Sequence, residues 1–240
     1  LGCFDLERLA FRLDALQRAR IDTHILPRVA ADYPALGEER PGVPVYAALG
    51  DNQASFIGSV REIRGTALVN VGTGSQLSVW TRDPLPAPGI DLRPFPFGGF
   101  IAVGAALCGG RAYALLRDFF RRTVRLFSGA EDAQCADDAE GAVAWDAMNA
   151  VDESILPGGR LAVDTRFSGT RTDPGARGGI AGLGSDTFTP EHLVVGVREG
   201  IAAELHGFFE CLPEATRREV VRLVGSGNAI RLNPALRRAF

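Results

Sequence analysis

Apolar residues along the chain recur with two different spacings, one typical of helices and one typical of strands. The clearest helical spacing follows Thr189, where apolar residues return every three or four positions, at Leu193, Val197, Ile201, Leu205 and Phe208 or Phe209. Thr189 can cap such a helix, Pro190 suits its first helical position, and Glu191 favours its positive end. The pattern therefore predicts a long amphipathic helix that begins at residue 189.

Other segments predict shorter helices. Residues 4–20 carry leucines and a phenylalanine at near-helical spacing, so we expect one or two short amphipathic helices there. Residues 105–127 predict a longer helix with a glycine pair near its start. Two further helices are predicted over residues 54–63 and 233–240.

Strand-like alternation is clearest in TALVNVGTGSQLSVWT, residues 66–81. Apolar residues alternate there on both sides of a glycine-rich tetrapeptide, which predicts a β-hairpin whose turn is Gly72-Thr73-Gly74-Ser75. Shorter apolar runs predict further strands, at residues 43–50, at the start of 161–182 and within 219–228.

The remaining stretches predict connections. Residues 25–42 and 82–99 are rich in proline and glycine, residues 128–141 are acidic with small side chains and predict a solvated, mobile segment, and most of 161–182 predicts a glycine- and arginine-rich loop. The resulting order is helix, strand, hairpin, helix, strand, helix, strand, helix. This order predicts an α/β fold with a mixed sheet flanked by helices, rather than a bundle or a sandwich.

Composition narrows the classes of function. A chain of 240 residues with 46% apolar residues can bury a sizeable core in one or two domains. No apolar run approaches the roughly 20 residues that cross a bilayer, and the charged first residues are unlike a signal peptide. The net charge of -3, without a basic stripe, argues against nucleic acid as a partner. Because lysine does not occur, a P-loop is impossible.

Cysteine and histidine usage indicates neither a disulfide framework nor a metal site. The four cysteines are scattered without a CxxC pair, which suits a reduced cytoplasmic protein, with a disulfide as the alternative: Cys3, Cys108, Cys135 and Cys211. The histidines have no metal-ligand spacing, and we expect all three to be surface or partly buried residues: His24, His192 and His206.

The stretch AALGDNQASFIGS, residues 47–59, places a carboxylate directly after a short apolar run. Asp51 would then lie at the carboxyl end of a buried strand, where open α/β sheets bind ligands, and could accept a proton from a substrate hydroxyl. A turn aspartate that hydrogen-bonds its own backbone is the competing interpretation of Gly50-Asp51. On the dipeptide alone, the turn is favoured.

Two glycine motifs could contact phosphate, and each has an ordinary structural explanation. In NVGTGSQ, the glycines around Thr73 can present N–H groups to phosphate oxygens, or they can form a plain hairpin turn. At Gly109 and Gly110, glycines can expose amides at the positive end of a helix, or they can permit close packing of the helix on a strand.

A third motif, LVGSGN, follows a predicted strand. A flat base can lie against the nearly side-chain-free backbone of Gly225, Gly227 and Asn228, or these residues can form a simple turn. Each of the motifs is weak alone, and their order along the chain is more informative.

That order resembles the FGGY carbohydrate kinases, which phosphorylate sugars and polyols with ATP on an actin-like, ribonuclease H-like fold. The resemblance runs essentially end to end, and the sedoheptulokinases are the most similar branch. It rests on Leu26-Pro27 and on the segments GDNQASFIGS, LVNVGTGSQLS, FSGTRTDPGARG, TPEHLVVGVREGIAAEL and GSGNAIRLNPAL.

The resemblance implies roles for the first two motifs. Asp51 matches the family's catalytic aspartate, which activates the sugar hydroxyl, and Asn52 matches the adjacent substrate-contacting amide, a glutamine in several relatives. Gly72, Thr73 and Gly74 match the hairpin that contacts the terminal phosphates of ATP. The implied mechanism is in-line phosphoryl transfer, with backbone amides and Mg²⁺ stabilising the transferred group and two lobes closing over the substrates.

The later motifs would bind the rest of the nucleotide. Gly110 matches a glycine near the phosphates, although the glutamine that some relatives carry four residues later is Ala114 here. Gly225, Gly227 and Asn228 match the turn against which adenosine lies. The resemblance therefore implies ATP, Mg²⁺ and a small-molecule sugar as partners, allows a homodimer, and assigns no metal ligand among these residues.

Relatives in this family are about twice as long and carry a DxGT hairpin and most sugar contacts in an amino-terminal lobe, which this chain lacks. We expect residues 1–63 to be the tail of that sugar-binding lobe and 64–240 to be most of the nucleotide-binding lobe, shortened at its end. Alone, such a fragment is expected not to turn over sugar.

Two rival interpretations stay open. A remnant or pseudokinase would bind nucleotide or a protein partner without catalysis, and an upstream DxGT motif would count against it. A nucleotide-hydrolysing chaperone of the same superfold is disfavoured by the Gly-Asp-Asn-Gln ahead of the hairpin.

Overall fold

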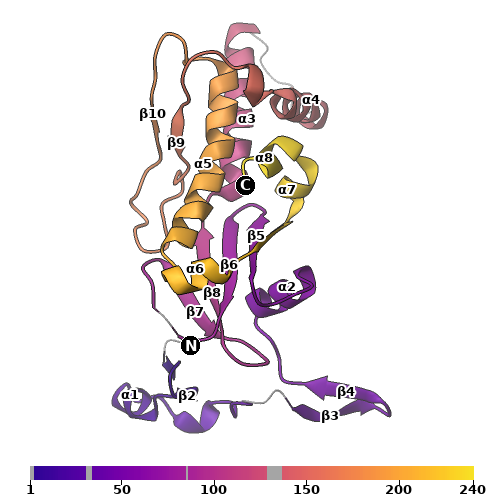
Figure 1. Ribbon diagram of the computed structural model, residues 1–240, viewed down its shortest axis with the longest axis vertical. Helices are drawn as coiled ribbons and strands as arrows, with labels where there is room; N and C mark the ends of the chain where they lie inside the picture. The colour runs from indigo at the N-terminus through magenta and orange to yellow at the C-terminus, as the bar shows by residue number, and fades with distance from the viewer. Residues whose placement is uncertain (1–2, 31–33, 85, 129–136) are drawn as a thin grey trace.

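A five-stranded mixed sheet forms the centre of the molecule (Figure 1). The computed structural model describes residues 3–30, 34–84, 86–128 and 137–240. The strand order is β11-β5-β6-β8-β7, in which β11 and β5 are parallel and all other neighbours antiparallel. The bounds are β5 Thr66–Val71, β6 Ser75–Thr81, β7 Ile90–Pro94, β8 Phe100–Ala106 and β11 Arg222–Ser226. The predicted α/β class with a mixed sheet and the predicted hairpin are both confirmed.

One face of this sheet is covered by the long helix α5, Pro190–Glu210, and a second long helix, α3, Gly109–Ser128, packs against α5. Alternate strand residues pack with these helices in the larger apolar core: Ala67, Val69, Val71, Leu77, Val79 and Ala102 on the sheet, with Ala112, Val194, Val197, Ile201 and Leu205 on the helices. The α5 helix is capped as the sequence predicted, since the Thr189 hydroxyl accepts a hydrogen bond from the His192 amide and Pro190 follows.

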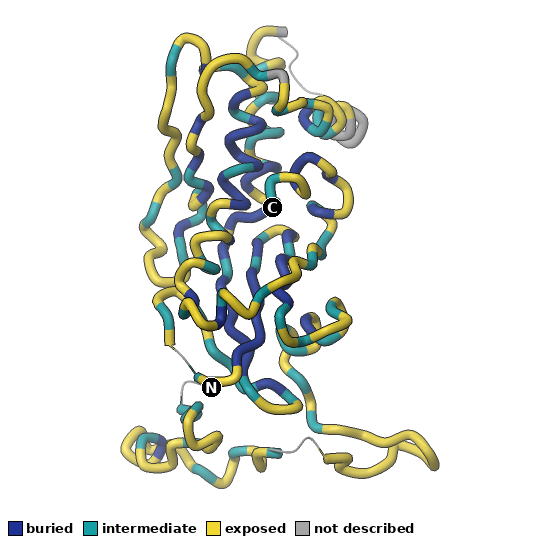
Figure 2. Tube along the Cα trace, in the orientation of Figure 1, coloured by how far each residue is buried: buried dark blue, intermediate teal, exposed yellow. Residues whose placement is uncertain are grey.

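The opposite face is covered by the short helix α2, Asp51–Ser59. Phe56 of this helix is fully buried among the sheet residues that point to this side, Leu68, Trp80, Ile101 and Val103. Along each strand, alternate residues thus pack into two different apolar cores on opposite faces of the sheet, as the two-residue period of a strand requires. Burial is concentrated in the central strands β5, β6 and β8 and in α5, along the middle of the molecule in Figure 2.

The chain after α5 returns to the sheet and then to the helices. A short helix α6, Glu214–Glu219, leads into β11, and α7, Asn228–Leu232, and α8, Pro234–Arg238, follow without a long loop. Asn233 caps α8 by accepting a hydrogen bond from the Leu236 amide at 2.9 Å. The predicted strand within 219–228 and the helix in 233–240 are confirmed.

The first part of the chain differs from the prediction. Residues 4–20 form a small β-ladder, β1 Phe4–Asp5 with β2 Ala10–Phe11, before a single helix, α1 Leu13–Arg18. A 3₁₀ turn, η1 Thr23–Ile25, and an antiparallel pair, β3 Ala35–Arg40 with β4 Val43–Tyr46, come next. These elements lie below the main sheet in Figure 1. The predicted short helix is therefore confirmed at α1, while a helix over residues 4–11 was wrong, because leucines at helical spacing also fit tight turns between short strands.

Several later elements were missed or misplaced. Residues 82–99 contain the edge strand β7, and residues 100–106 form β8 rather than the start of the 105–127 helix. A helix α4, Asp137–Ala150, occupies part of the stretch predicted to be mobile, while residues 129–136 lie outside the described part. Residues 161–182 hold a ladder of β9, Ala162–Asp164, and β10, Gly179–Ala181, after the 3₁₀ turn η2, Glu153–Ile155.

In the described part of the chain, no helix is long and apolar enough to span a membrane. The described cysteines Cys3, Cys108 and Cys211 are free, and Cys135 lies outside the described residues. His192 is 2% exposed, with Nδ1 2.8 Å from the Thr189 hydroxyl and Nε2 3.0 Å from the Pro157 carbonyl oxygen. The prediction that all three histidines are at most partly buried was therefore wrong for His192, which holds the start of α5 to the preceding loop.

Candidate nucleotide site and candidate base

Three glycine-rich segments meet at one edge of the sheet. Because β11 runs parallel to β5, with Ser226 opposite Asn70, the turn after β11 emerges beside the β5–β6 turn. The start of α3 closes the third side: the Gly110 amide donates to the Gly72 carbonyl at 2.8 Å, and the Arg111 amide donates to the Thr73 carbonyl at 3.0 Å. Residues far apart in sequence, at 72–74, 109–111 and 225–228, are thus brought together.

At Gly109, Gly110 and Gly227, neighbouring backbone lies too close to leave room for a side chain. A Cβ atom on Gly110 would lie 2.4 Å from the Gly72 carbonyl oxygen, and one on Gly109 would lie 2.6 Å from the Gly74 carbonyl carbon. Gly227 has a φ of +90°, and its Cβ would lie 2.5 Å from the Val71 carbonyl oxygen. Tight packing is therefore one function of each of these glycines.

The hydrogen bonds between the start of α3 and the β5–β6 turn limit which backbone amides can contact a phosphate. The N–H groups of Gly110 and Arg111 donate to the turn, and the Gly72 N–H donates to the Gly74 carbonyl at 2.9 Å. Thr73 is exposed at the tip of the turn, where its hydroxyl remains a donor to a ligand. The positive end of the α3 dipole points into this turn and favours an anion there.

A cavity of about 540 Å³ adjoins the turn after β11. All three residues of the predicted adenosine turn line it, together with two arginines and an apolar wall: Gly225, Gly227, Asn228, Arg231, Arg237, Val69, Leu223, Ile230 and Phe240. Arg231 donates to the Asn228 amide oxygen at 3.2 Å and so orients that side chain. The volume lies in the usual range for small-molecule sites, and an apolar wall beside polar groups suits a flat base with a polar edge.

Asp51 is the first residue of α2 rather than the end of a buried strand. The strand β4 ends at Tyr46, is exposed and pairs only with β3 among the described strands, which corrects the expected placement. Gly50 provides the extended backbone before the helix, with φ of −66° and ψ of 152°. The Asp51 carboxylate is 92% exposed and lies at the positive end of the helix dipole.

The two side chains of the predicted substrate pair contact each other. The backbone amide and the side-chain amide of Asn52 donate to Oδ1 of Asp51, at 2.7 and 3.1 Å. The second oxygen of the carboxylate is left to face solvent or a ligand. A carboxylate held in this way can orient a hydroxyl and accept its proton.

Asp51 lies at the other end of the strands from the glycine-rich turn. Its cationic neighbour is Arg93 of β7, which is opposite Ile101 of β8, itself opposite Trp80 of β6. The turn begins at the far end of β6, and the stretch from Ser75 to Trp80 spans about 17 Å at the usual rise per residue. This conformation brings together the predicted nucleotide residues but does not bring Asp51 to them.

Sequence reasoning missed the charged groups that extend from Asp51. Arg93 lies 3.6 Å from Asp91, and Asp91 lies 3.1 Å from Arg171 of the glycine- and arginine-rich loop. The alternation of charge in the segment 90–94 was the available signal, but the segment was predicted as a loop. The ion pair between Arg93 and Asp51 places Arg93 beside the start of α2, and Asp91 follows through its contact with Arg93.

The residues present fit Mg²⁺ only as a companion of the nucleotide. No group of three or more histidine, cysteine, aspartate or glutamate side chains is placed to hold a metal among the described residues. Mg²⁺ is commonly held by one or two carboxylates together with substrate phosphates. An ion at this site would be held largely by the phosphate oxygens themselves.

The fold and the three converging segments define a class of protein. Residues 67–240 match the model of the C-terminal domain of the FGGY family of carbohydrate kinases, and the chain belongs to this family. Among curated relatives, it is 26% identical to a sedoheptulokinase from Mus musculus over 98% of this chain and 50% of that protein. It is 27% identical to a glycerol kinase from Alteromonas mediterranea over 81% of this chain and 38% of that protein.

Solved structures confirm the predicted actin-like fold. A xylulose kinase from Rhodospirillum rubrum superposes with a TM-score of 0.77 at 21% identity, over 99% of this chain and 47% of that one. A gluconate kinase from Lactobacillus acidophilus has a TM-score of 0.75 at 18% identity, over 98% of this chain and 47% of that one. The chain spans half or less of the length of the relatives it matches.

Proposed function

We propose that this chain supplies the nucleotide-binding half and the base of an ATP-dependent sugar kinase. The observation that carries the proposal is the convergence of three glycine-rich segments beside a cavity of about 540 Å³. In this proposal, adenosine lies in the cavity against Gly225, Gly227 and Asn228, and the phosphates extend toward Thr73 between Gly72 and Gly74, with Gly110 supporting the turn. Residues 64–240 form this half, and residues 1–63 belong to a sugar-binding half.

The reaction is in-line transfer of the terminal phosphoryl group to a sugar hydroxyl. Asp51 accepts the hydroxyl proton, and Asn52 holds the carboxylate and contacts the sugar. Mg²⁺ bound with ATP neutralises charge on the phosphates. Because the carboxylate and the turn are separated here, transfer requires closure that brings Asp51 within hydrogen-bond reach of the acceptor hydroxyl.

A ketose such as sedoheptulose is the substrate class we propose. The support is the sedoheptulokinase from Mus musculus, which aligns with 98% of this chain at 26% identity. A panel of heptuloses, pentuloses, hexuloses and glycerol, offered to the protein that carries both halves, tests this choice. Turnover highest on glycerol would contradict it.

Two variants test the proposal at separate steps. Asp51→Asn, in the protein with both halves, should abolish sugar-dependent ADP release and leave ATP affinity unchanged in calorimetric titration. Gly227→Val should abolish ATP binding, since its Cβ would lie 2.5 Å from the Val71 carbonyl oxygen and distort the turn. Near-normal turnover by Asp51→Asn would show that the base is another residue.

The assay of sugar-dependent ADP release separates the kinase from the non-catalytic alternative. A pseudokinase lobe would bind ATP, yet Asp51→Asn would change nothing, because the parent protein would have no sugar-dependent ADP release to lose.

A further inference from the structure

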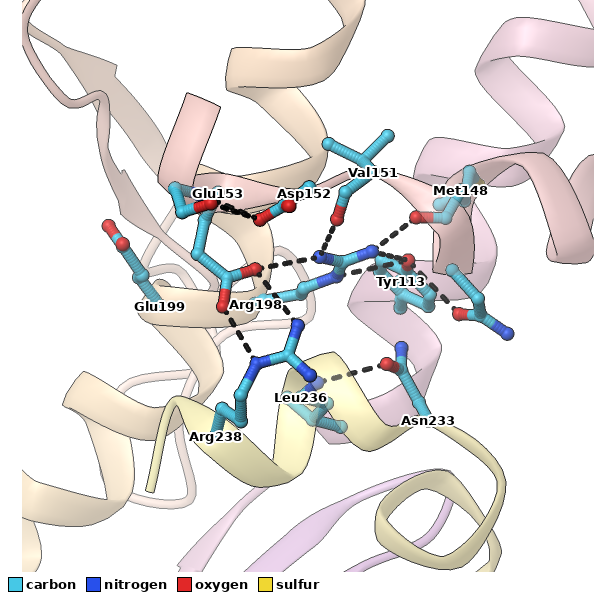
Figure 3. Close-up of polar contacts among 12 residues, drawn as sticks. Tyr113, Met148, Val151, Asp152, Glu153, Arg198, Glu199, Asn233, Leu236 and Arg238 are labelled. Atoms are coloured by element: carbon cyan, nitrogen blue, oxygen red, sulfur yellow. Dashed lines mark hydrogen bonds and ion pairs between the residues drawn. The ribbon is translucent and has the colours of Figure 1, made fainter. Parts of the chain in front are cut away.

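One arginine in the core has an unusually complete set of partners. Arg198 of α5 has a side chain only 3% exposed and reaches across to α3 and to the end of α4 (Figure 3). Its Nε and Nη2 donate to the hydroxyl of Tyr113 at 3.3 and 3.2 Å, and its Nη1 donates to the Val151 carbonyl at 3.0 Å. Nη2 also donates to the carbonyl of Met148. The guanidinium is therefore fixed in one orientation.

The charge of Arg198 is matched by Glu153, at the start of η2. Oε2 of Glu153 lies 3.7 Å from Nη1 of Arg198, while Arg238 of α8 donates to Oε1 at 2.9 Å and to Oε2 at 3.4 Å. The hydrogen bond from Arg238 is the main cause that lowers the pKa of the Glu153 carboxyl below its ordinary value, so the carboxylate stays ionised between the two cations. Glu153 thus joins a buried arginine to one that is 58% exposed.

The helix held by this bridge forms part of the candidate nucleotide cavity. Arg238 contacts Glu153 from α8, and the preceding residue, Arg237, lines the cavity together with Phe240 just after the helix. The helix α8 is only five residues long and follows α7 directly, which in turn follows the Gly227 turn. A shift of α8 would therefore move one wall of the cavity and the turn at its base.

We propose that Glu153 and Arg238, anchored by Arg198, are positioning residues that set the wall of the nucleotide cavity. This inference rests on the proposed function, in which ATP occupies the cavity. None of the three is assigned a contact with the nucleotide: Glu153 holds α8 through Arg238, and α8 places Arg237 and Phe240. An exposed ion pair contributes little to folding stability, so its effect should be larger on nucleotide affinity than on unfolding.

The test compares Arg238→Gln, Arg238→Lys and a matched control, Arg218→Gln. The control breaks a similar exposed ion pair, Arg218 with Glu214 on α6, whose residues do not line the cavity. ATP affinity is measured by calorimetric titration and the unfolding midpoint by circular dichroism. Arg238→Gln should weaken ATP binding about fivefold to tenfold, within the roughly twofold to thirtyfold effect of residues that act on a site without touching its ligand.

The remaining variants show whether the loss of ATP affinity is specific to the contact between Glu153 and Arg238. Arg238→Lys keeps the charge toward Glu153 and should recover most of the affinity, while Arg218→Gln should bind ATP as the parent does. The double variant Glu153→Gln with Arg238→Gln should be no weaker than the single variants, because both remove the same link. Arg238→Gln, Arg238→Lys and Arg218→Gln should keep the parent's unfolding midpoint within about 3 °C. The double variant is compared by affinity alone, because losing Glu153 also leaves the buried Arg198 without its carboxylate.

Different failures have different meanings. If the parent chain does not bind ATP, the proposed function fails first and this inference fails with it. If the parent binds ATP and Arg238→Gln binds it equally well, the positioning role is wrong while the proposed function stands. A loss of affinity that only accompanies a large fall in the unfolding midpoint would also overturn it, since a purely structural contact predicts that result.

Discussion

Nη1 of Arg93 lies 3.8 Å from Oδ1 of Asp51 and joins the edge strand β7 to the first residue of α2. Two neighbouring contacts reinforce this junction. The Gln53 side-chain amide donates to the Pro94 carbonyl at 3.1 Å, and the ring of Phe56 meets the ring of Phe95 edge-on at 5.9 Å. The end of β7 and the loop after it therefore hold the candidate base in place.

Removing the cation at this junction should affect stability very little. Because the Asp51 carboxylate is 92% exposed, Arg93→Gln is expected to change the free energy of unfolding by less than about 1 kcal/mol. Urea denaturation followed by circular dichroism measures this, and raising the salt concentration should not alter the difference from the parent by more than the same amount. A loss above about 2 kcal/mol would mean that Arg93 holds the fold together rather than only facing Asp51.

The apolar part of the junction should be far more important for stability. Phe56 is fully buried, so Phe56→Ala removes its contacts with the sheet and leaves a cavity, and we expect a loss of about 3–5 kcal/mol in unfolding free energy. Phe188→Ala, at a side chain 70% exposed, is the matched control and should stay within about 0.5 kcal/mol of the parent. Equal effects of the two variants would show that α2 is not packed on the sheet in solution.

The parts of the fold that followed from sequence are those in which local pattern and long-range packing agree. The α5 helix has a cap at Thr189, proline at its first position and an apolar stripe, and each of these alone would indicate its start. The β5–β6 hairpin has alternation on both sides of a glycine turn. At both elements the burial of side chains reinforces what the local sequence already favours.

The parts that were not predicted depend on distant partners. The strand β7 contains Pro94 and lies in a proline-rich stretch, yet it pairs with β8 because it is an edge strand that proline can end. The exposure of β4 and the position of Asp51 at a helix start could not be read from an apolar run that resembles a buried strand. Arg93 is identified as the neighbour of Asp51 only by the ion pair that the folded chain forms between them.

The glycine-rich turn should tolerate no side chain on the helix that closes it. In Gly110→Ala, the new methyl group would lie 2.4 Å from the Gly72 carbonyl oxygen, a backbone atom that cannot rotate away. We expect a loss of about 1–3 kcal/mol in unfolding free energy from the forced displacement, and weaker ATP binding in the same sample.

A second glycine-to-alanine change isolates this steric effect. Gly58 is also in a helix, and a Cβ there would meet nothing within 4 Å. Gly58→Ala should be neutral or should stabilise the protein by up to about 1 kcal/mol through helix propensity. If both variants were equally stable, the contact between the start of α3 and the turn would not be as tight as the structure shows.

Two carboxylates beside β9 should give opposite dependences of stability on pH. Burial is the main cause that raises the pKa of Glu204, whose Oε2 accepts a hydrogen bond from the Thr165 hydroxyl at 2.9 Å. Hydrogen bonds from Arg166 are the main cause that lowers the pKa of Asp164. As pH rises from the unfolded pKa of Glu204 to its raised folded pKa, the unfolded state releases its proton first, and Glu204 makes the folded state less stable.

Replacing each carboxylate by its amide should therefore shift stability in opposite directions at pH 7. Glu204→Gln keeps an acceptor for Thr165 and removes the buried charge, so it should be more stable than the parent at pH 7, with the advantage shrinking toward pH 4.5. Asp164→Asn should be less stable at pH 7, with the deficit disappearing as pH falls through the lowered pKa of Asp164. Urea denaturation in steps from pH 3 to pH 8 measures both. A Glu204→Gln protein less stable than the parent at pH 7 would show that the charge of Glu204 is compensated in the folded state.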